Sequence, residues 1–152
     1  MDLGLQGKVA LVLGAGGGLG SAIAKTLASE GARVALADID ATALDRVVAE
    51  LKQGGGDAMA AAFDLADHAA MDARVSAIEA AFAPIDILVN NTGGPPPTPA
   101  AGQDPALWSK SFEQMVLSVI TLTDRVLPGM RARKWGRIVT STSSGVVSPI
   151  PN

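Results

Sequence analysis

A glycine-rich turn between an apolar run and a helical pattern constrains this chain more than any other feature of its sequence. Residues 14–20 read Gly-Ala-Gly-Gly-Gly-Leu-Gly, directly after the apolar run Val9–Leu13 and directly before an amphipathic stretch. Glycines at Gly14, Gly18 and Gly20 let the backbone turn tightly and approach a pyrophosphate, and the following helix points its positive N-terminal end at that charge. Such a turn also occurs for strand-to-helix packing alone, so the residues around it must decide between ligand binding and packing.

An acidic residue closes the next apolar run. Asp38 follows the run 33–37, and a second aspartate, Asp40, stands just before a helical pattern that begins near Ala41. A carboxylate at the end of this strand accepts hydrogen bonds from the ribose hydroxyls of adenosine and repels a 2′-phosphate, which favours NAD over NADP. Either aspartate is also suited to cap the helix. Both interpretations hold if each aspartate serves one role.

Apolar runs alternate with longer amphipathic stretches along the whole chain. The runs are continuously apolar, as expected of parallel strands buried on both faces, and the alternation is typical of βαβ units. We therefore predict an α/β fold, a doubly wound Rossmann-type parallel sheet, in one dinucleotide-binding domain spanning residues 1–152. The predicted strands are 9–13, 33–37, 58–63, 85–90 and 137–142, and the predicted helices are 19–29, 41–52, 69–82 and 105–133.

The last predicted helix, 105–133, is apolar around most of its circumference and follows a Gly- and Pro-rich loop at 92–104. A helix that is apolar on all sides must be buried on both sides. One side is expected to face the sheet, and the other to pack against the same helix of a second subunit in a homodimer or homotetramer, or against missing C-terminal helices. The apolar residues are Met115, Val116, Leu117, Val119, Ile120, Leu122, Val126 and Leu127.

Composition excludes several classes of function. The chain has no cysteine, which excludes disulfides, thiolate metal sites and a thiol nucleophile, and agrees with a cytoplasmic protein. Lys+Arg 12 against Asp+Glu 15 gives a net charge of −3, so we expect no nucleic-acid partner. The N-terminus lacks a secretory pattern and no apolar run approaches the roughly 20 residues that span a bilayer, so we expect no membrane association. The one histidine, His68, lies at a polar helix start, where we expect it in solvent.

Three motifs in order resemble those of the short-chain dehydrogenase/reductase family. The segment 13–20 matches the family's Thr-Gly-x-x-x-Gly-x-Gly signature except that Leu13 replaces the threonine. Asp64-Leu65 stands where the family has an acidic and an apolar residue after the third strand, and Asn90-Asn91-Thr92-Gly93 stands where it has Asn-Asn-Ala-Gly after the fourth. The resemblance covers about residues 5–151, nearly the whole chain but only the first part of a typical member.

The resemblance implies a cofactor site built from these motifs. Asp64 and Leu65 would flank the adenine. Asn91 and Gly93, with Thr92 between them, would line the adenosine ribose and the rim of the fourth strand. Members that prefer NADP often carry a basic residue where this chain has Gly17, which again favours NAD. From the residues alone, Asn90 and Asn91 are equally suited to tie neighbouring strands together as turn formers. The expected cofactor-binding residues are Gly14, Ala15, Gly16, Gly17, Gly18, Leu19 (near the nicotinamide), Gly20, Asp38, Asp64, Leu65, Asn91, Thr92 and Gly93.

The same resemblance places a catalytic serine after the fifth strand. Ser143 takes that position, with Ser144 as the alternative one residue on, and would hold the substrate oxygen against the nicotinamide. The family's general acid/base is a tyrosine followed four residues on by a lysine, and such proton transfer contributes about 10² to 10⁴-fold to the rate. This chain has no tyrosine. We therefore expect a chain that is truncated before the Tyr-x-x-x-Lys segment, without its C-terminal strands and helices.

Met115 is a second departure from the family pattern. It stands where an asparagine usually supports a water and the catalytic lysine, and methionine offers no comparable hydrogen bond. Ser118, one turn away, is a candidate replacement. The resemblance predicts an NAD-dependent oxidoreductase that transfers hydride between the nicotinamide and a small-molecule carbonyl or alcohol. The alternative is a non-catalytic dinucleotide-binding module, or an inactive fragment that lacks the catalytic tyrosine and lysine.

Overall fold

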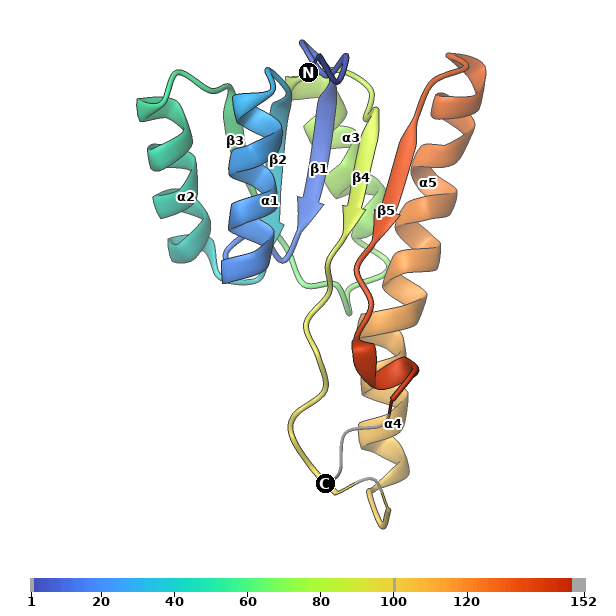
Figure 1. Cartoon of the computed structure of the whole chain (residues 1–152). Coiled ribbons are helices and arrows are strands. Elements are labelled where there is room, and N and C mark those ends of the chain that lie inside the picture. Colours follow the sequence, from blue (N-terminus) through green and yellow to red (C-terminus); the bar gives the residue numbers. More distant parts are fainter. Residues whose placement is uncertain (1, 100, 149–152) are drawn as a thin grey trace.

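Five parallel strands form the centre of the molecule. The computed structural model describes residues 2–99 and 101–148, and within them the strands lie in the order β3-β2-β1-β4-β5 (Figure 1). Neighbouring strands pair in parallel, with Val9 opposite Arg33 and Ile87 opposite Arg137. All five therefore end at one edge of the sheet. The strands are β1 (Val9–Leu13), β2 (Arg33–Asp38), β3 (Ala58–Ala62), β4 (Ile87–Asn90) and β5 (Arg137–Thr140).

Helices cover both faces of this sheet, which confirms the predicted doubly wound fold. Helices α1 and α2 pack on one face, and α3 and α5 on the other (Figure 1). Successive strand residues point to opposite faces, so Leu11 joins the core around Leu122 while Val12 joins the core around Leu44. Two cores explain the continuously apolar runs. The helices are α1 (Gly18–Ser29), α2 (Ala41–Gln53), α3 (Met71–Ala81), α4 (Pro105–Phe112) and α5 (Ser118–Ala132).

Several elements are shorter than predicted at their ends. Strand β3 stops before Phe63, β4 begins after Asp86, and β5 stops before Ser141. These flanking residues still make strand-like hydrogen bonds, such as that from the Phe63 N–H to the Asp38 carbonyl (3.1 Å) and from the Ser141 N–H to the Asn90 carbonyl (3.0 Å). They lie outside the regular ladder, because the backbone there already turns toward the connecting loop.

The prediction of one regular helix over 105–133 is wrong. Between α4 and α5 the chain makes a wider π-helical turn, η1 (Glu113–Leu117), in which the Ser118 N–H donates to the Glu113 carbonyl. Ser118 is fully buried, and its Oγ donates to the Gln114 carbonyl at 2.5 Å. A hydroxyl that occupies a helical carbonyl competes with the regular helical hydrogen bonds and favours such a local change of geometry.

Buried residues in this long helical segment occur only in α5, on one side, since α4 and η1 have none. Leu122, Val126 and Met130 face the core. On the other side, four large apolar residues at intervals of four form what we call the exposed stripe: Trp108, Phe112, Val116 and Ile120. Strand β5 is exposed along its length, with Val139 55% exposed. Among the described helices, none has the length and apolar composition needed to cross a membrane.

A cluster of charges joins α3 to α5. Arg125 pairs with Asp72 and with Glu79 (3.0 Å) and donates to the Ser76 hydroxyl (3.0 Å). Burial opposes the positive charge of Arg125, but the hydrogen bonds to Asp72 and Glu79 outweigh it and raise the pKa of the guanidinium. The cluster therefore joins α5 to α3.

Candidate functional site

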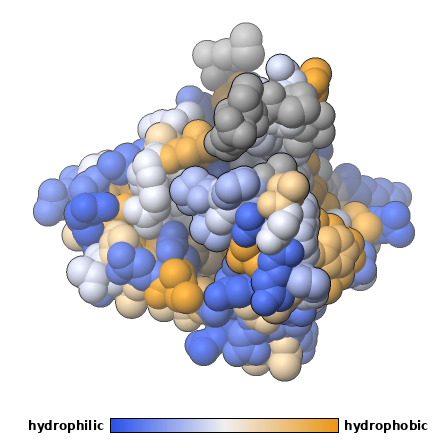
Figure 2. Space-filling view, turned by 90° about the horizontal axis from the view of Figure 1, so that it is seen from below, coloured by the Kyte–Doolittle hydropathy of each residue, from blue (hydrophilic) through white to orange (hydrophobic). Residues whose placement is uncertain are grey.

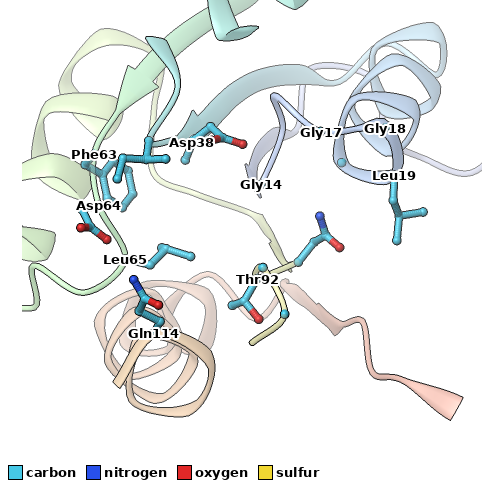
Figure 3. A pocket seen from close by; sticks show the side chains of 16 residues that line it. Gly14, Gly17, Gly18, Leu19, Asp38, Phe63, Asp64, Leu65, Thr92 and Gln114 are labelled. Carbon is cyan, nitrogen blue, oxygen red and sulfur yellow. The ribbon is translucent and has the colours of Figure 1, made fainter. Parts of the chain in front are cut away.

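A cavity of about 440 Å³ opens at the carboxyl ends of β1 to β4 (Figure 3). Parallel α/β sheets bind their ligands at this edge, where the strand order reverses. The cavity brings together most of the residues that the sequence motifs singled out, from four separate loops. Those residues are Gly14, Gly17, Gly18, Leu19, Gly20, Asp38, Asp64, Leu65, Asn91, Thr92 and Gly93.

Glycines of the turn fall into two groups. Gly14 has a φ of +61°, and a Cβ there would overlap the Asn91 carbonyl oxygen. A Cβ at Gly20 would overlap the Gly14 carbonyl group, so both glycines are required by packing alone. At Gly18, by contrast, a Cβ would meet nothing within 4 Å. Packing within the protein therefore gives no reason for glycine at position 18, and Gly18 is one of the residues that line the cavity.

Helix α1 presents its N-terminus to this space. It begins at Gly18 after Gly17, no side chain caps it, and its first turn contains no acidic residue. The first N–H groups of a helix have no partner within the helix, and the helix dipole makes this end positive. This arrangement is suited to hold an anionic group such as a pyrophosphate.

Ala15 and Gly16, which the sequence placed in the cofactor site, lie outside the cavity lining. Ala15 is fully buried, and its N–H donates to the Ala37 carbonyl (3.1 Å). The Gly16 N–H donates to Asp38 Oδ2 (3.0 Å), and a Cβ at Gly16 would lie 3.0 Å from the same oxygen. These two residues attach the glycine turn to the end of β2.

The structure places the two aspartates of residues 38–40 in different surroundings. Asp40 caps α2, since its Oδ1 accepts from the Ala43 N–H (3.0 Å). Asp38 lines the cavity, and its carboxylate is oriented by the N–H groups of Gly16 and Asp40 (3.0 and 3.1 Å). None of the lining residues is a lysine or arginine. A ligand group beside Asp38 would therefore meet a negative charge without a basic counterpart in the lining.

Three polar residues at the strand ends stabilise the structure around the cavity, and two of them, Asp64 and Asn91, also line it. Asn90 is buried and donates to Thr140 Oγ1 (3.3 Å), which ties β4 to β5. Asn91 donates to the Leu13 carbonyl (3.3 Å) and accepts from Ser141 Oγ (3.1 Å), while it also lines the cavity. Asp64 Oδ1 accepts from the Ala66 N–H (2.9 Å). The strand-tying role of both asparagines is confirmed, and Asn91 adds a surface to the cavity.

Ser143 stands apart from the cavity lining. It is exposed, precedes the short 3₁₀ turn η2 (Ser144–Val146), and its Oγ accepts from the Gly145 N–H (3.0 Å). The hydroxyl of Ser141, two residues earlier, donates a hydrogen bond to Asn91 Oδ1. Ser143 therefore lies beyond the end of β5, as predicted, but it is not among the 16 residues that line the cavity.

Two further residues differ from their expected surroundings. The Ser118 hydroxyl, the candidate replacement for the asparagine expected at Met115, is buried and donates to the Gln114 carbonyl. His68 was expected in solvent, but both of its ring nitrogens are enclosed and have no partner among the described residues. His68 lies in the loop before α3, where its carbonyl accepts from the Met71 N–H (3.4 Å).

A second, apolar cavity of about 590 Å³ lies between the loop after β4 and helix α4. It adjoins the first along the chain: Gly94 lines the first and Pro95 the second, and Gln114 lines the first and Met115 the second. Seen from below, the surface of the molecule alternates hydrophobic and hydrophilic areas (Figure 2). The second cavity is lined by Pro95, Pro96, Pro97, Thr98, Pro99, Gln103, Leu107, Trp108, Ser111, Phe112, Met115 and Val116.

Sequence reasoning missed five residues of the first cavity. They are Ala37, Ile39, Phe63, Gly94 and Gln114. Four of them are immediate neighbours of predicted residues. Gln114 comes from a distant helical segment, where it ends the mostly polar run 109–114, so the sequence gives no signal for it.

Comparison with known proteins agrees with this geometry. The family model described as short chain dehydrogenase matches residues 8–152. The chain is 38% identical over 145 residues to 2,3-dihydro-2,3-dihydroxybenzoate dehydrogenase of Bacillus subtilis (strain 168), covering 94% of this chain and 56% of that protein. It is also 38% identical over 142 residues to 7alpha-hydroxysteroid dehydrogenase of Escherichia coli (strain K12), covering 93% and 55%. The chain thus spans about half the length of these relatives.

Solved structures give the same result. A 7alpha-hydroxysteroid dehydrogenase complexed with NADH and 7-oxo glycochenodeoxycholic acid matches with a TM-score of 0.92 and 36% identity, over 97% of this chain and 58% of that one. L-sorbose reductase from Gluconobacter frateurii, complexed with NADPH and L-sorbose, matches with a TM-score of 0.92 and 34% identity, over 99% and 57%. With the family model matched from residue 8 onward, the chain belongs to the short-chain dehydrogenase family.

Proposed function

We propose that this chain binds NAD in the first cavity and prefers it to NADP. The observation that carries the proposal is the pairing, in one cavity, of the open space at Gly18 with the oriented carboxylate of Asp38. The pyrophosphate would lie at the N-terminus of α1, and the adenosine ribose would donate hydrogen bonds to Asp38. A 2′-phosphate at the same place would face that carboxylate with no basic residue in the lining.

We further propose that the chain is the nucleotide-binding part of an oxidoreductase. Bound nicotinamide dinucleotide would supply hydride exchange with a carbonyl or alcohol carbon. Leu19 would contact the nicotinamide half of the cofactor, and the Ser143 hydroxyl would orient the substrate oxygen. The 7alpha-hydroxysteroid dehydrogenase and L-sorbose reductase structures contain a dinucleotide and a small-molecule substrate, which supports this class of reaction. The apolar cavity beside the loop 92–103 is the candidate region for substrate selectivity.

The second candidate is a dinucleotide-binding module without catalysis. Met115 offers no hydrogen bond comparable to that of the usual asparagine, and the Ser118 hydroxyl already donates to the Gln114 carbonyl. Binding with no turnover of ketones or secondary alcohols would support this candidate. Turnover that is lost in Ser143→Ala, with NAD affinity retained, would support the first.

We also propose that the protein works in the cytoplasm as a homodimer or homotetramer. The exposed stripe and the uncovered strand β5 support a contact with further protein, because large apolar side chains and strand edges in water favour association. Residues around Ile120 would then be covered by the same segment of a second copy.

Calorimetric titration with NAD and NADP tests the cofactor preference, using two matched variants. Asp38→Asn removes the cavity carboxylate. Asp40→Asn removes the same charge two residues away and keeps a good helix cap. We expect wild type and Asp40→Asn to prefer NAD, and Asp38→Asn to lose most of that preference. Equal affinity of the wild type for both cofactors would refute the role of Asp38, and binding of neither would refute the proposed function.

A further inference from the structure

Gln114 is a polar side chain in the cofactor cavity that the proposed function has not yet used. It belongs to η1 and lines the cavity together with Asp64 and Leu65, which follow β3. Figure 3 shows its amide reaching into the cavity on the side of Leu65. The Gln114 amide makes no hydrogen bond to any other described residue, whereas Asp38, Asp64 and Asn91 are all held by the backbone around them. Its donors and acceptor are available to a ligand.

The backbone of Gln114 is nevertheless fixed. Its carbonyl accepts a hydrogen bond from the fully buried Ser118 hydroxyl. The π-helical turn around it departs from the regular helix on either side, a feature that frequently occurs at functional sites. Because the main chain is held in place, presenting the amide to a ligand costs only the ordering of one side chain.

The order of the strands indicates which part of the cofactor meets Gln114. The glycine turn follows β1, Asp38 ends β2, and Asp64 and Leu65 follow β3, and these three strands are neighbours in that order. A dinucleotide with its pyrophosphate at the glycine turn and its ribose at Asp38 directs its base onward, toward the end of β3. This step rests on the proposed function. The base would then lie where Leu65 supplies apolar contact and Gln114 supplies an amide.

We propose that Gln114 selects adenine as the base of the cofactor. Adenine carries an amino donor next to a ring-nitrogen acceptor, and a glutamine amide matches this pair with its carbonyl oxygen and its NH₂ group. Gln114 Oε1 accepts from the exocyclic amino group, and Nε2 donates to the adjacent ring nitrogen N7, a pair that hypoxanthine cannot match because it presents two acceptors at this edge. The carboxylate of Asp64 is acceptor-only, so it contacts the amino group but not the ring nitrogen.

Titration with NAD and with nicotinamide hypoxanthine dinucleotide tests this role. Hypoxanthine has a carbonyl oxygen where adenine has the amino group. We expect the wild type to bind NAD about 5- to 150-fold more tightly, the discrimination typical of a bidentate amide contact to a base. Gln114→Met keeps the length of the side chain without its amide, and should lower this preference severalfold by weakening the binding of NAD.

Gln53→Met is the matched control, because Gln53 is exposed at the end of α2 and outside the cavity. It should behave like the wild type. If Gln114→Met does not fold, Gln114→Glu, which keeps the acceptor and loses the donor, should likewise reduce the preference. An unchanged ratio in a folded Gln114 variant would overturn the role of Gln114 while leaving dinucleotide binding intact. Binding of neither dinucleotide by the wild type would refute the proposed function and this role together.

Discussion

Replacing Gly18 by alanine separates what the cofactor requires from what the fold requires. A Cβ at Gly18 would meet no atom within 4 Å, and its φ lies outside the left-handed region. Alanine at a compatible position stabilises a protein by about 0.4–1 kcal/mol, which for a domain of this size raises Tm by about 1–4 °C. The same methyl group occupies the space beside the N-terminus of α1 where the pyrophosphate is proposed to lie. We therefore expect a variant that is at least as stable as the wild type but binds NAD poorly.

The size of the binding loss follows from the contacts at risk. A hydrogen bond between a backbone N–H and a charged phosphate oxygen contributes about 1.5–3 kcal/mol. Displacing one such contact weakens binding about 10- to 150-fold. Thermal unfolding by circular dichroism measures the first effect, and calorimetric titration with NAD measures the second.

Gly20→Ala is the matched comparison within the same turn. Its Cβ would overlap the Gly14 carbonyl and lie 2.6 Å from the carbonyl carbon, so backbone must move. We expect destabilisation of about 1–3 kcal/mol or more. If Gly18→Ala binds NAD as tightly as the wild type, or unfolds as readily as Gly20→Ala, the assignment of the open space at Gly18 to the cofactor is wrong.

Three further predictions concern the helices. Arg125→Met removes the ion pairs between α3 and α5 and should cost about 0.2–1 kcal/mol, since the partners are partly exposed; urea unfolding should show the loss at low salt and less of it at high salt. The hydrogen bond and charge of Lys25 lower the pKa of Glu50 below 4.5, so this pair stabilises the fold above the unfolded pKa and ceases to do so as the pH falls through the folded pKa. In Lys25→Met, Tm should therefore fall less steeply than in the wild type as the pH decreases just below 4.5. An unchanged dependence of Tm on pH in this range would contradict this. Ile120→Glu places a charge in the exposed stripe and should convert an oligomer to a monomer in sedimentation; a wild type that is already monomeric contradicts the homo-oligomer.

Much of the fold could be predicted because its signals are local. Runs such as Val9–Leu13 are apolar without interruption, and only strands buried on both faces require this. The interruption of the last helix could not be predicted from residues 105–133. It depends on a hydrogen bond from Ser118 to a backbone carbonyl in the preceding turn, and serine in a helix often makes no such change.

The residues of the candidate site also differ in how far the sequence alone could predict their roles. The motifs identified Asp38 as a ribose ligand but left the helix cap open between Asp38 and Asp40, because both are carboxylates just before the helix start. The structure assigns the cap to Asp40 and places Asp38 in the cavity, because only Asp38 reaches the Gly16 N–H. Gln114 was not predicted, since only the folding of η1 against the end of β3 brings it to the cavity.

By itself the sequence determined a doubly wound sheet with a glycine turn at its ligand-binding edge, because strand burial and tight turns leave patterns in consecutive residues. It could not distinguish glycines that the fold needs from a glycine that a ligand needs. Gly20 and Gly18 look alike in the motif, yet one faces the carbonyl of Gly14 and the other faces open space. That difference depends on atoms from several segments meeting at one point, and only the tertiary structure decides it.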